Sequence, residues 1–150
     1  MTYQIETRRV EPQPIAVVHR RAALDQLKIV VPEACGTSWN LVKKLGLKGG
    51  RNIAVYLDGT EQGEISMEVG QEVDARFANT AELFCSATPI GDVATTAHIG
   101  PYHQLGEAHR AIVQWAADHQ RKLAGPNWEL YGHWTDDVTQ LRTDVFYLLG

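Results

Sequence analysis

The sequence has few cysteines, no long apolar run and no excess of positive charge. Its two cysteines, Cys35 and Cys85, are too few for a disulfide framework and indicate free thiols in a reducing compartment. No apolar stretch approaches the roughly 20 residues of a membrane-spanning helix, and residues 1–25 carry arginines instead of a signal peptide. Acidic residues outnumber basic ones, 18 to 14, which argues against a nucleic-acid-binding face. These absences predict a cytoplasmic protein with no membrane partner and no direct nucleic-acid partner.

The length and composition predict one globular domain over residues 1–150. The chain is 44% hydrophobic and 21% charged, which is typical of a folded domain and excludes a disordered chain. Alternating and apolar segments predict strands over residues 14–20, 52–58, 64–73, 82–88, 93–98, 128–135 and 144–149. Helices are expected over residues 32–45 and 100–123, and residues 136–143 are expected to form a polar loop.

The order of these elements repeats in the two halves of the chain. The pairs His19 and His98, Trp39 and Trp115, and Tyr56 and Tyr131 are 79, 76 and 75 residues apart. Each half, about 1–80 and 81–150, is predicted to form a strand-helix-strand-strand module. The expected fold is α+β, with the duplicated modules forming an antiparallel sheet, two long helices and a central ligand cleft.

Several motifs in the second half resemble those of the GyrI-like, AraC-type effector-binding family. The resemblance covers about residues 89–149, whereas residues 1–88 match by pattern alone. It implies a pocket for hydrophobic, often cationic, small molecules, with a buried glutamate in its floor at Glu129. The first half lacks the Gly-x-Tyr helix start. The motifs are Pro89-x-Gly91-x-Val93-Ala94, His98, Gly100-Pro101-Tyr102 and Glu129-x-Tyr131.

The residues themselves leave two interpretations of Glu129 open. In a strand, Glu129, Tyr131 and His133 point to one side, and Trp128 and Trp134 point to the other. A mid-strand carboxylate among aromatic residues must pair, take up a proton or bind a cation, unless that side faces solvent. The resemblance favours Glu129 as a pocket residue over a solvent-facing one.

Other ligand-binding candidates follow from the same resemblance and from the symmetry of the halves. Tyr102 is expected at the start of the second helix, above a cleft or packed on the sheet. Tyr56, Met67 and Trp39 are candidates for pocket lining in the first half, although tryptophans in mid-helix usually belong to the core. Trp128 and Trp134 are expected to pack under a helix.

Metal and nucleophilic sites are not expected. The six histidines include no His-Glu-x-x-His motif, and His109 is expected to point away from Glu107. His98 is interpreted as a structural hydrogen-bonding residue beside the Gly-Pro turn. No Gly-x-Ser-x-Gly motif is present, so neither a metal nor another cofactor is predicted.

The sequence therefore predicts a stand-alone small-molecule-binding protein for a hydrophobic, aromatic or cationic ligand. Two alternatives stay open. The first is a hydrolase of cyclopropanoid or related electrophilic toxins, with Glu129 and Tyr102 as catalytic residues and toxin resistance as its role. The second is a protein inhibitor of DNA gyrase, in which case the partner is a topoisomerase or a regulator.

Overall fold

The computed structural model describes residues 2–59 and 63–150, which form two compact units. Residues 12–88 make up one unit, called here the contiguous unit. Residues 89–150 and the N-terminal residues up to Glu11 make up the other, called the split unit. Within the described residues, no helix is both long and apolar enough to cross a membrane.

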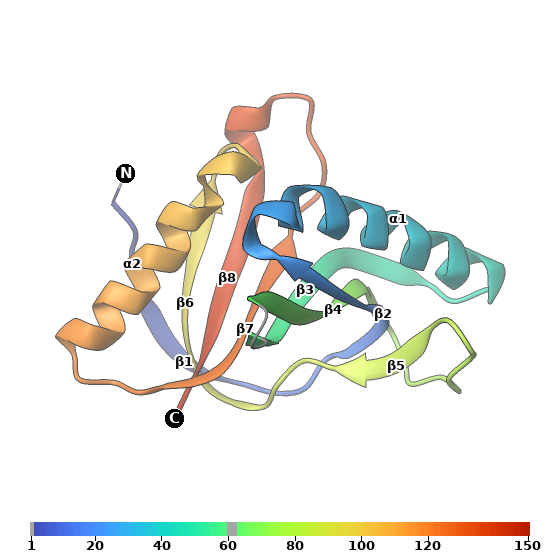
Figure 1. The fold of residues 1–150 in the computed structure, drawn as a ribbon, viewed down its shortest axis with the longest axis horizontal. Coiled ribbons are helices and arrows are strands. Elements are labelled where there is room, and N and C mark those ends of the chain that lie inside the picture. The colour runs from blue at the N-terminus through green and yellow to red at the C-terminus, as the bar shows by residue number, and fades with distance from the viewer. Residues whose placement is uncertain (1, 60–62) are drawn as a thin grey trace. The chain divides into compact units, whose positions relative to one another are not determined.

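The contiguous unit has four antiparallel strands and one long helix (Figure 1). The strand order is β3-β4-β2-β5, and α1 packs on β2, β3 and β4. A 3₁₀ turn at Leu24–Gln26 leads from β2 into the helix. The elements are β2 (Pro14–Ala23), α1 (Leu27–Lys44), β3 (Gly49–Gly59), β4 (Glu64–Val73) and β5 (Phe84–Ala87).

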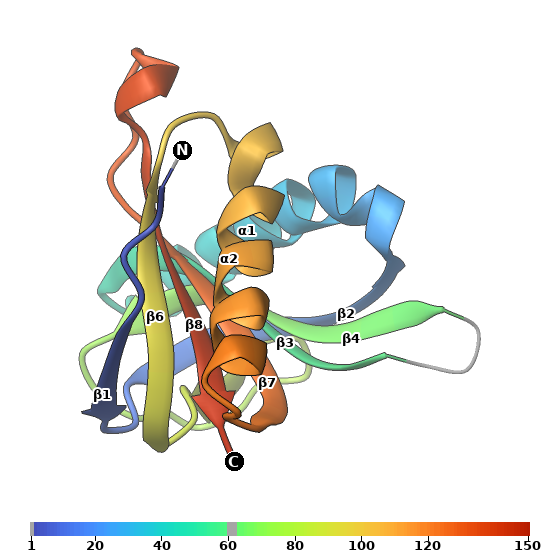
Figure 2. The same cartoon turned by 90° about the vertical axis from the view of Figure 1, so that its left-hand side faces the viewer.

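The split unit repeats this arrangement, with α2 lying along β6 and β8 (Figure 2). Its strand order is β1-β6-β8-β7, again antiparallel. Further 3₁₀ turns occupy Tyr102–Gln104 and Val138–Gln140. The elements are β1 (Glu6–Val10), β6 (Gly91–Ile99), α2 (Leu105–Asp118), β7 (Leu123–Tyr131) and β8 (Arg142–Leu149).

The two units confirm the predicted α+β class with duplicated modules, eight antiparallel strands and two long helices. Each module also has an added edge strand. β5 follows its module in the chain and pairs with β2, whereas β1 precedes its module and pairs with β6. The cleft expected from the sequence stays a prediction.

The buried faces of the two helices have the same spacing. Each buried position in α2 lies 74 residues after its counterpart in α1. Trp39 and Trp115 are 76 residues apart, so they do not occupy corresponding positions, and the symmetry predicted for them is wrong. The four buried residues are Val31, Ala34, Ser38 and Val42 in α1, and Leu105, Ala108, Ile112 and Ala116 in α2.

The apolar face predicted for α1 is displaced around the helix. Ala34 and Ser38 are fully buried, whereas Cys35 is half-buried and Leu45 is exposed. The small side chains of Ala34 and Ser38 allow the helix to lie close to the sheet, so the larger residues beside them lie at its margin. Burial raises the pKa of the Cys35 thiol to about 11.

Strand registers give a second test of the repeat. Tyr56 pairs with Met67, which pairs with Arg20, and Tyr131 pairs with Thr143, which pairs with His98. The two tyrosines therefore occupy corresponding rows, as predicted. The counterpart of His98 is Arg20 and not His19, which lies one row further and is exposed.

Several predicted boundaries differ from the structure. The second helix ends at Asp118 and not near Leu123, because Gln120 adopts a left-handed φ of 54° and β7 begins soon afterwards. The first helix begins at Leu27, so Pro32 lies inside it. The strand predicted over 128–135 ends at Tyr131. Trp134 is therefore 68% exposed, and the prediction that it packs under a helix is wrong.

Candidate functional site

One side of the split unit's sheet faces α2, and the strand registers decide which residues it carries. Val145 of β8 pairs with Thr96 of β6 and with Glu129 of β7, so these three side chains share a side. Val145 packs against the buried face of α2, which fixes that side as the helix-facing one. Residues two positions away along each strand point the same way, including Tyr131 and Tyr147.

Glu129 is 6% exposed and is hydrogen-bonded through both carboxylate oxygens. Tyr131, two residues further along β7, donates its hydroxyl to Oε1 at 2.5 Å. His109 of α2 approaches Oε2 with Nε2 at 2.6 Å. The Glu-x-Tyr motif thus has a direct physical meaning, because a spacing of two on a strand places the phenol beside the carboxylate.

His109 also contacts Tyr147 of β8. The phenol oxygen lies 2.7 Å from Nδ1, and the two rings meet edge to face with centroids 5.5 Å apart. Burial, followed by the nearby charge of Glu129, raises the pKa of Tyr147 to about 12. Its hydroxyl is therefore protonated at neutral pH. Glu129, Tyr131, His109 and Tyr147 are called the polar cluster below.

The prediction that His109 points away from any site missed this contact. His109 lies four residues after Leu105 and three before Ile112, both of which are buried. This spacing places it at the edge of the helix face that packs on the sheet. A comparison of His109 with Leu105 and Ile112, instead of with Glu107 alone, would have identified it from the sequence.

Tyr102 lies in the 3₁₀ turn before α2, and its ring meets that of Tyr131 edge to face at 5.8 Å. Its side chain is 42% exposed. The structure therefore brings three predicted site residues together: Glu129, Tyr131 and Tyr102. Tyr131 is the link, since it contacts the other two.

The Gly100-Pro101 turn before Tyr102 is held by His98. His98 is fully buried, and it contacts the Tyr3 hydroxyl through Nδ1 at 2.8 Å and the Pro101 carbonyl through Nε2 at 3.1 Å. Gly100 has a φ of 142°, which favours glycine. These contacts agree with a structural role for His98, which fixes the turn that carries Tyr102.

Comparison with known proteins adds a family to this geometry. Residues 1–149 match the family described as GyrI-like small molecule binding domain. The chain belongs to the GyrI-like family. No curated protein matches it.

Solved structures with the same fold are distant in sequence from this GyrI-like chain. The EcmrR C-terminal domain is 18% identical, with a TM-score of 0.82, and the match covers 100% of this chain and 99% of that domain. SAV2435, solved bound to tetraphenylphosphonium, is 11% identical with a TM-score of 0.73 and coverages of 100% and 94%. A hydrolase encoded by lin2189 from Listeria innocua is 9% identical with a TM-score of 0.62 and coverages of 98% and 92%.

The contiguous unit of this GyrI-like protein has no carboxylate–imidazole pair at the corresponding positions. Ala54 lies two residues before Tyr56, as Glu129 lies before Tyr131, and Cys35 follows buried Ala34 as His109 follows buried Ala108. Gln71 occupies the row of Tyr147 and donates hydrogen bonds to the Cys35 carbonyl and to Asn52. The polar cluster is therefore specific to the split unit.

Tyr56 and Met67 are both buried and form a registered pair, so the structure places these two predicted pocket residues side by side. Trp39 lies elsewhere. Its indole ring packs over Gly49 at the start of β3, where an added Cβ would lie 2.8 Å from the ring. Gly49 precedes Tyr56 by seven residues, or roughly 20 Å along a strand, so Trp39 is not brought together with that pair.

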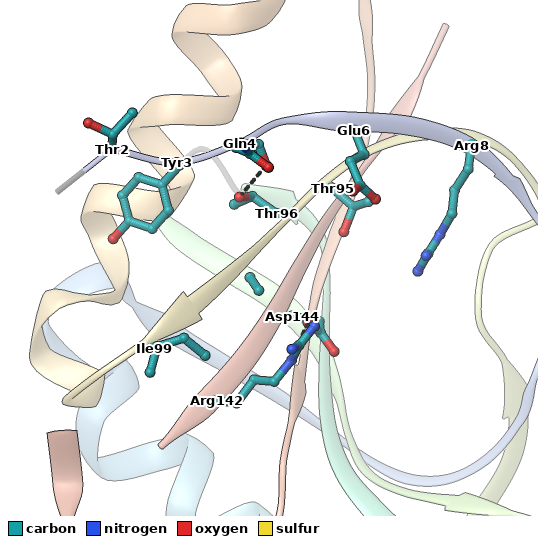
Figure 3. Close-up of a pocket in the computed structure, with 11 residues that line it drawn as sticks. Thr2, Tyr3, Gln4, Glu6, Arg8, Thr95, Thr96, Ile99, Arg142 and Asp144 are labelled. Atoms are coloured by element: carbon teal, nitrogen blue, oxygen red, sulfur yellow. Dashed lines mark hydrogen bonds and ion pairs between the residues drawn. The ribbon is translucent and has the colours of Figure 1, made fainter. Parts of the chain in front are cut away.

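A hollow of about 340 Å³ lies in the split unit, on the side of the sheet away from α2 (Figure 3). Thr95 and Asp144 line it, and both alternate with helix-facing neighbours. Arg142 pairs with Asp144 at 3.0 Å in its wall. This hollow is therefore separate from the polar cluster. Among the described residues, no group of three or more histidine, cysteine or acidic side chains is placed to hold a metal ion.

Proposed function

We propose that this GyrI-like protein binds an aromatic or hydrophobic cation at Glu129, with Tyr131 and Tyr102 as the aromatic wall of the site. One observation carries the proposal: a carboxylate that is 6% exposed lies beside two tyrosine rings, one of which donates to it. A buried negative charge attracts a cation strongly because little water screens it. Aromatic ring faces add attraction for the same cation.

The partners of Glu129 in the polar cluster are consistent with this ligand class. Tyr131 gives a neutral hydrogen bond, and His109 is charged only when it is protonated. Neither is a permanent positive charge such as an arginine. Solved SAV2435, which shares the fold, contains tetraphenylphosphonium, a hydrophobic cation, and this supports the same class of ligand here.

The test compares a cation with a neutral molecule of similar shape. Methyltriphenylphosphonium and triphenylphosphine oxide are titrated against the unmodified protein and against Glu129→Gln. Glutamine keeps the size and a hydrogen-bonding oxygen but removes the charge, so the cation should lose about 1–3 kcal/mol of binding free energy. The phosphine oxide should lose much less.

Glu107→Gln is the matched control, because it removes the same charge from an exposed position on α2. It should leave both affinities unchanged. Equal losses for the cation and for the phosphine oxide in Glu129→Gln would overturn the proposal, since Glu129 would then not recognise charge.

A second candidate function is hydrolysis of a strained electrophile, such as a cyclopropane-bearing toxin. The favouring observation is the pairing of Glu129 with His109, because a carboxylate hydrogen-bonded to an imidazole is a common acid–base arrangement. Mass spectrometry of such an electrophile incubated with the protein tests it. Turnover that disappears in Glu129→Gln while affinity is retained would favour the hydrolase over the binding protein.

A further inference from the structure

His109 is hydrogen-bonded through both ring nitrogens, and the two partners differ in kind. A carboxylate only accepts hydrogen bonds, so Nε2 carries a hydrogen and donates it to Glu129. The partner of Nδ1 is the Tyr147 hydroxyl, which is able to donate or accept. Neutral His109 accepts from that hydroxyl through Nδ1, and the imidazolium donates to it through the Nδ1 proton.

Both protonation states therefore fit the same heavy-atom positions. The contacts of 2.6 Å to Glu129 and 2.7 Å to Tyr147 serve either state, and only the direction of the second hydrogen bond changes. Tyr147 does not exchange charge with His109 near neutral pH, because burial raises its pKa to about 12. The charge change belongs to the imidazole.

The two states differ in the net charge next to the ligand. With neutral His109 and ionised Glu129, the polar cluster carries one negative charge. With the imidazolium, the cluster is neutral, and Glu129 already has a counter-ion at 2.6 Å. A hydrophobic cation is attracted by the first state and competes with a proton in the second.

On the basis of the function proposed above, we propose that His109 is a specificity-determining residue that couples cation binding at Glu129 to release of its Nδ1 proton. Cation affinity then rises with pH until His109 is neutral, and stays constant above that point. Neutral ligands gain nothing from the negative charge, so their affinity does not follow this titration. The polar cluster thus discriminates ligands by charge most strongly when the imidazole is neutral.

Other titratable groups lie near His109 on the elements packed around it. His98 of β6 is engaged by Tyr3 and Pro101, and its titration is a separate event. Glu107 and Arg110 are exposed neighbours on α2, and their charges raise and lower the pKa of Tyr3 respectively. The remaining groups are Glu129 and Tyr131 on β7, Tyr147 on β8, and Tyr102 and His103 in the 3₁₀ turn.

The experiment measures methyltriphenylphosphonium affinity from pH 5.5 to 8.5, the range in which imidazoles titrate. In the unmodified protein, affinity should fall about tenfold per pH unit on the acidic side of the His109 titration, since one proton is exchanged per ligand. His109→Gln should abolish that slope, because glutamine is a good helix former whose amide N–H donates to Glu129 without titrating. His98 and His103 remain in this variant, so they act as internal controls.

A second measurement uses the unmodified protein alone. Calorimetric titrations in two buffers of different ionisation enthalpy give the number of protons released. The cation should release close to one proton at the acidic end, and triphenylphosphine oxide should release none. This result does not depend on the folding of any variant.

The outcomes separate this inference from the proposed function. If Glu129→Gln abolishes the preference for the cation but affinity is constant from pH 5.5 to 8.5, binding at Glu129 stands and the coupling to His109 is wrong. A slope that persists in His109→Gln also overturns the coupling. If Glu129→Gln leaves the preference for the cation intact, the proposed function itself is wrong.

Discussion

At the scale of single residues, the chemistry of the split unit depends on which groups are able to change charge. Glu129 has hydrogen bonds to both oxygens, and His109 has partners at both nitrogens. The Tyr147 hydroxyl, unlike the carboxylate, accommodates either direction of hydrogen bond. Its removal should therefore affect the two protonation states of His109 unequally.

Tyr147→Phe tests this inequality. A hydrogen bond to a charged group contributes about 1.5–3 kcal/mol, compared with about 0.5–1.5 kcal/mol for a neutral one, so the imidazolium loses more than the neutral ring. The pKa of His109 should fall by about one unit in the variant. The midpoint of the pH profile of methyltriphenylphosphonium affinity should move down by the same amount. An unchanged midpoint would show that the Tyr147 hydroxyl does not stabilise the protonated ring.

The sequence alone predicts part of this site. Glu129 and Tyr131 share a strand, so their spacing of two is enough to place both side chains on one side of the sheet. His109 joins them from α2, a different element, and its distance to Glu129 depends on how the helix packs on the sheet. No pattern within one element determines that distance, although the spacing of His109 from Leu105 and Ile112 indicates which helix face carries it.

At the scale of elements, the positions of strands with strong alternation are predictable from the sequence and those of polar strands are not. The strand predicted over 64–73 has those bounds in the structure as β4. β1 is not predicted, because four of its five residues are exposed and it lies at a sheet edge, so its sequence has no buried face to reveal it. The predicted end of α2 is wrong because Gln120, not a glycine, adopts the left-handed conformation there.

Gly70 of β4 gives a prediction at this scale. A Cβ at this position would lie 1.7 Å from the carbonyl oxygen of Ala16 in the neighbouring strand β2. Gly70→Ala should destabilise the protein by about 3 kcal/mol or more, because backbone atoms in the middle of a paired strand have little room to move. Urea unfolding of the purified variant measures the loss.

Gly36→Ala is the matched control for Gly70→Ala. Gly36 lies within α1, and an added Cβ there meets nothing within 4 Å. Alanine should stabilise the helix by about 0.5–1 kcal/mol at that position. If both variants lose similar stability, the close approach of β2 and β4 is not the cause.

At the scale of the whole molecule, the two units differ in how the chain builds them. The contiguous unit uses residues 12–88 only, whereas the split unit needs both the N-terminal residues and residues 89–150. β1 pairs with β6, Tyr3 bonds to His98, and Tyr3 and Ile5 pack on the core beneath α2. The first residues of the chain therefore contribute to the fold that carries Glu129.

Deletion of residues 2–11 should destabilise the split unit selectively. The loss of buried apolar side chains should cost about 2–5 kcal/mol. Hydrogen exchange followed by mass spectrometry should show faster exchange in β6 and α2, with little change in β3 and β4. Tyr3→Phe, which removes only the phenol hydroxyl bonded to His98, should give a smaller effect in the same region. Uniform loss of protection across both units would contradict this prediction.

The difference between corresponding positions in the two units has a consequence for the search for similar sites in relatives. A transfer of residues between halves by a constant offset assigns the carboxylate of Glu129 to Ala54 and the imidazole of His109 to Cys35, where neither chemistry exists. A search anchored on the paired tyrosines finds two hits per chain, of which one has the acid. Relatives are therefore best screened for three features of the second module together: the acid two residues before the tyrosine, a histidine on the preceding helix, and a phenol on the last strand.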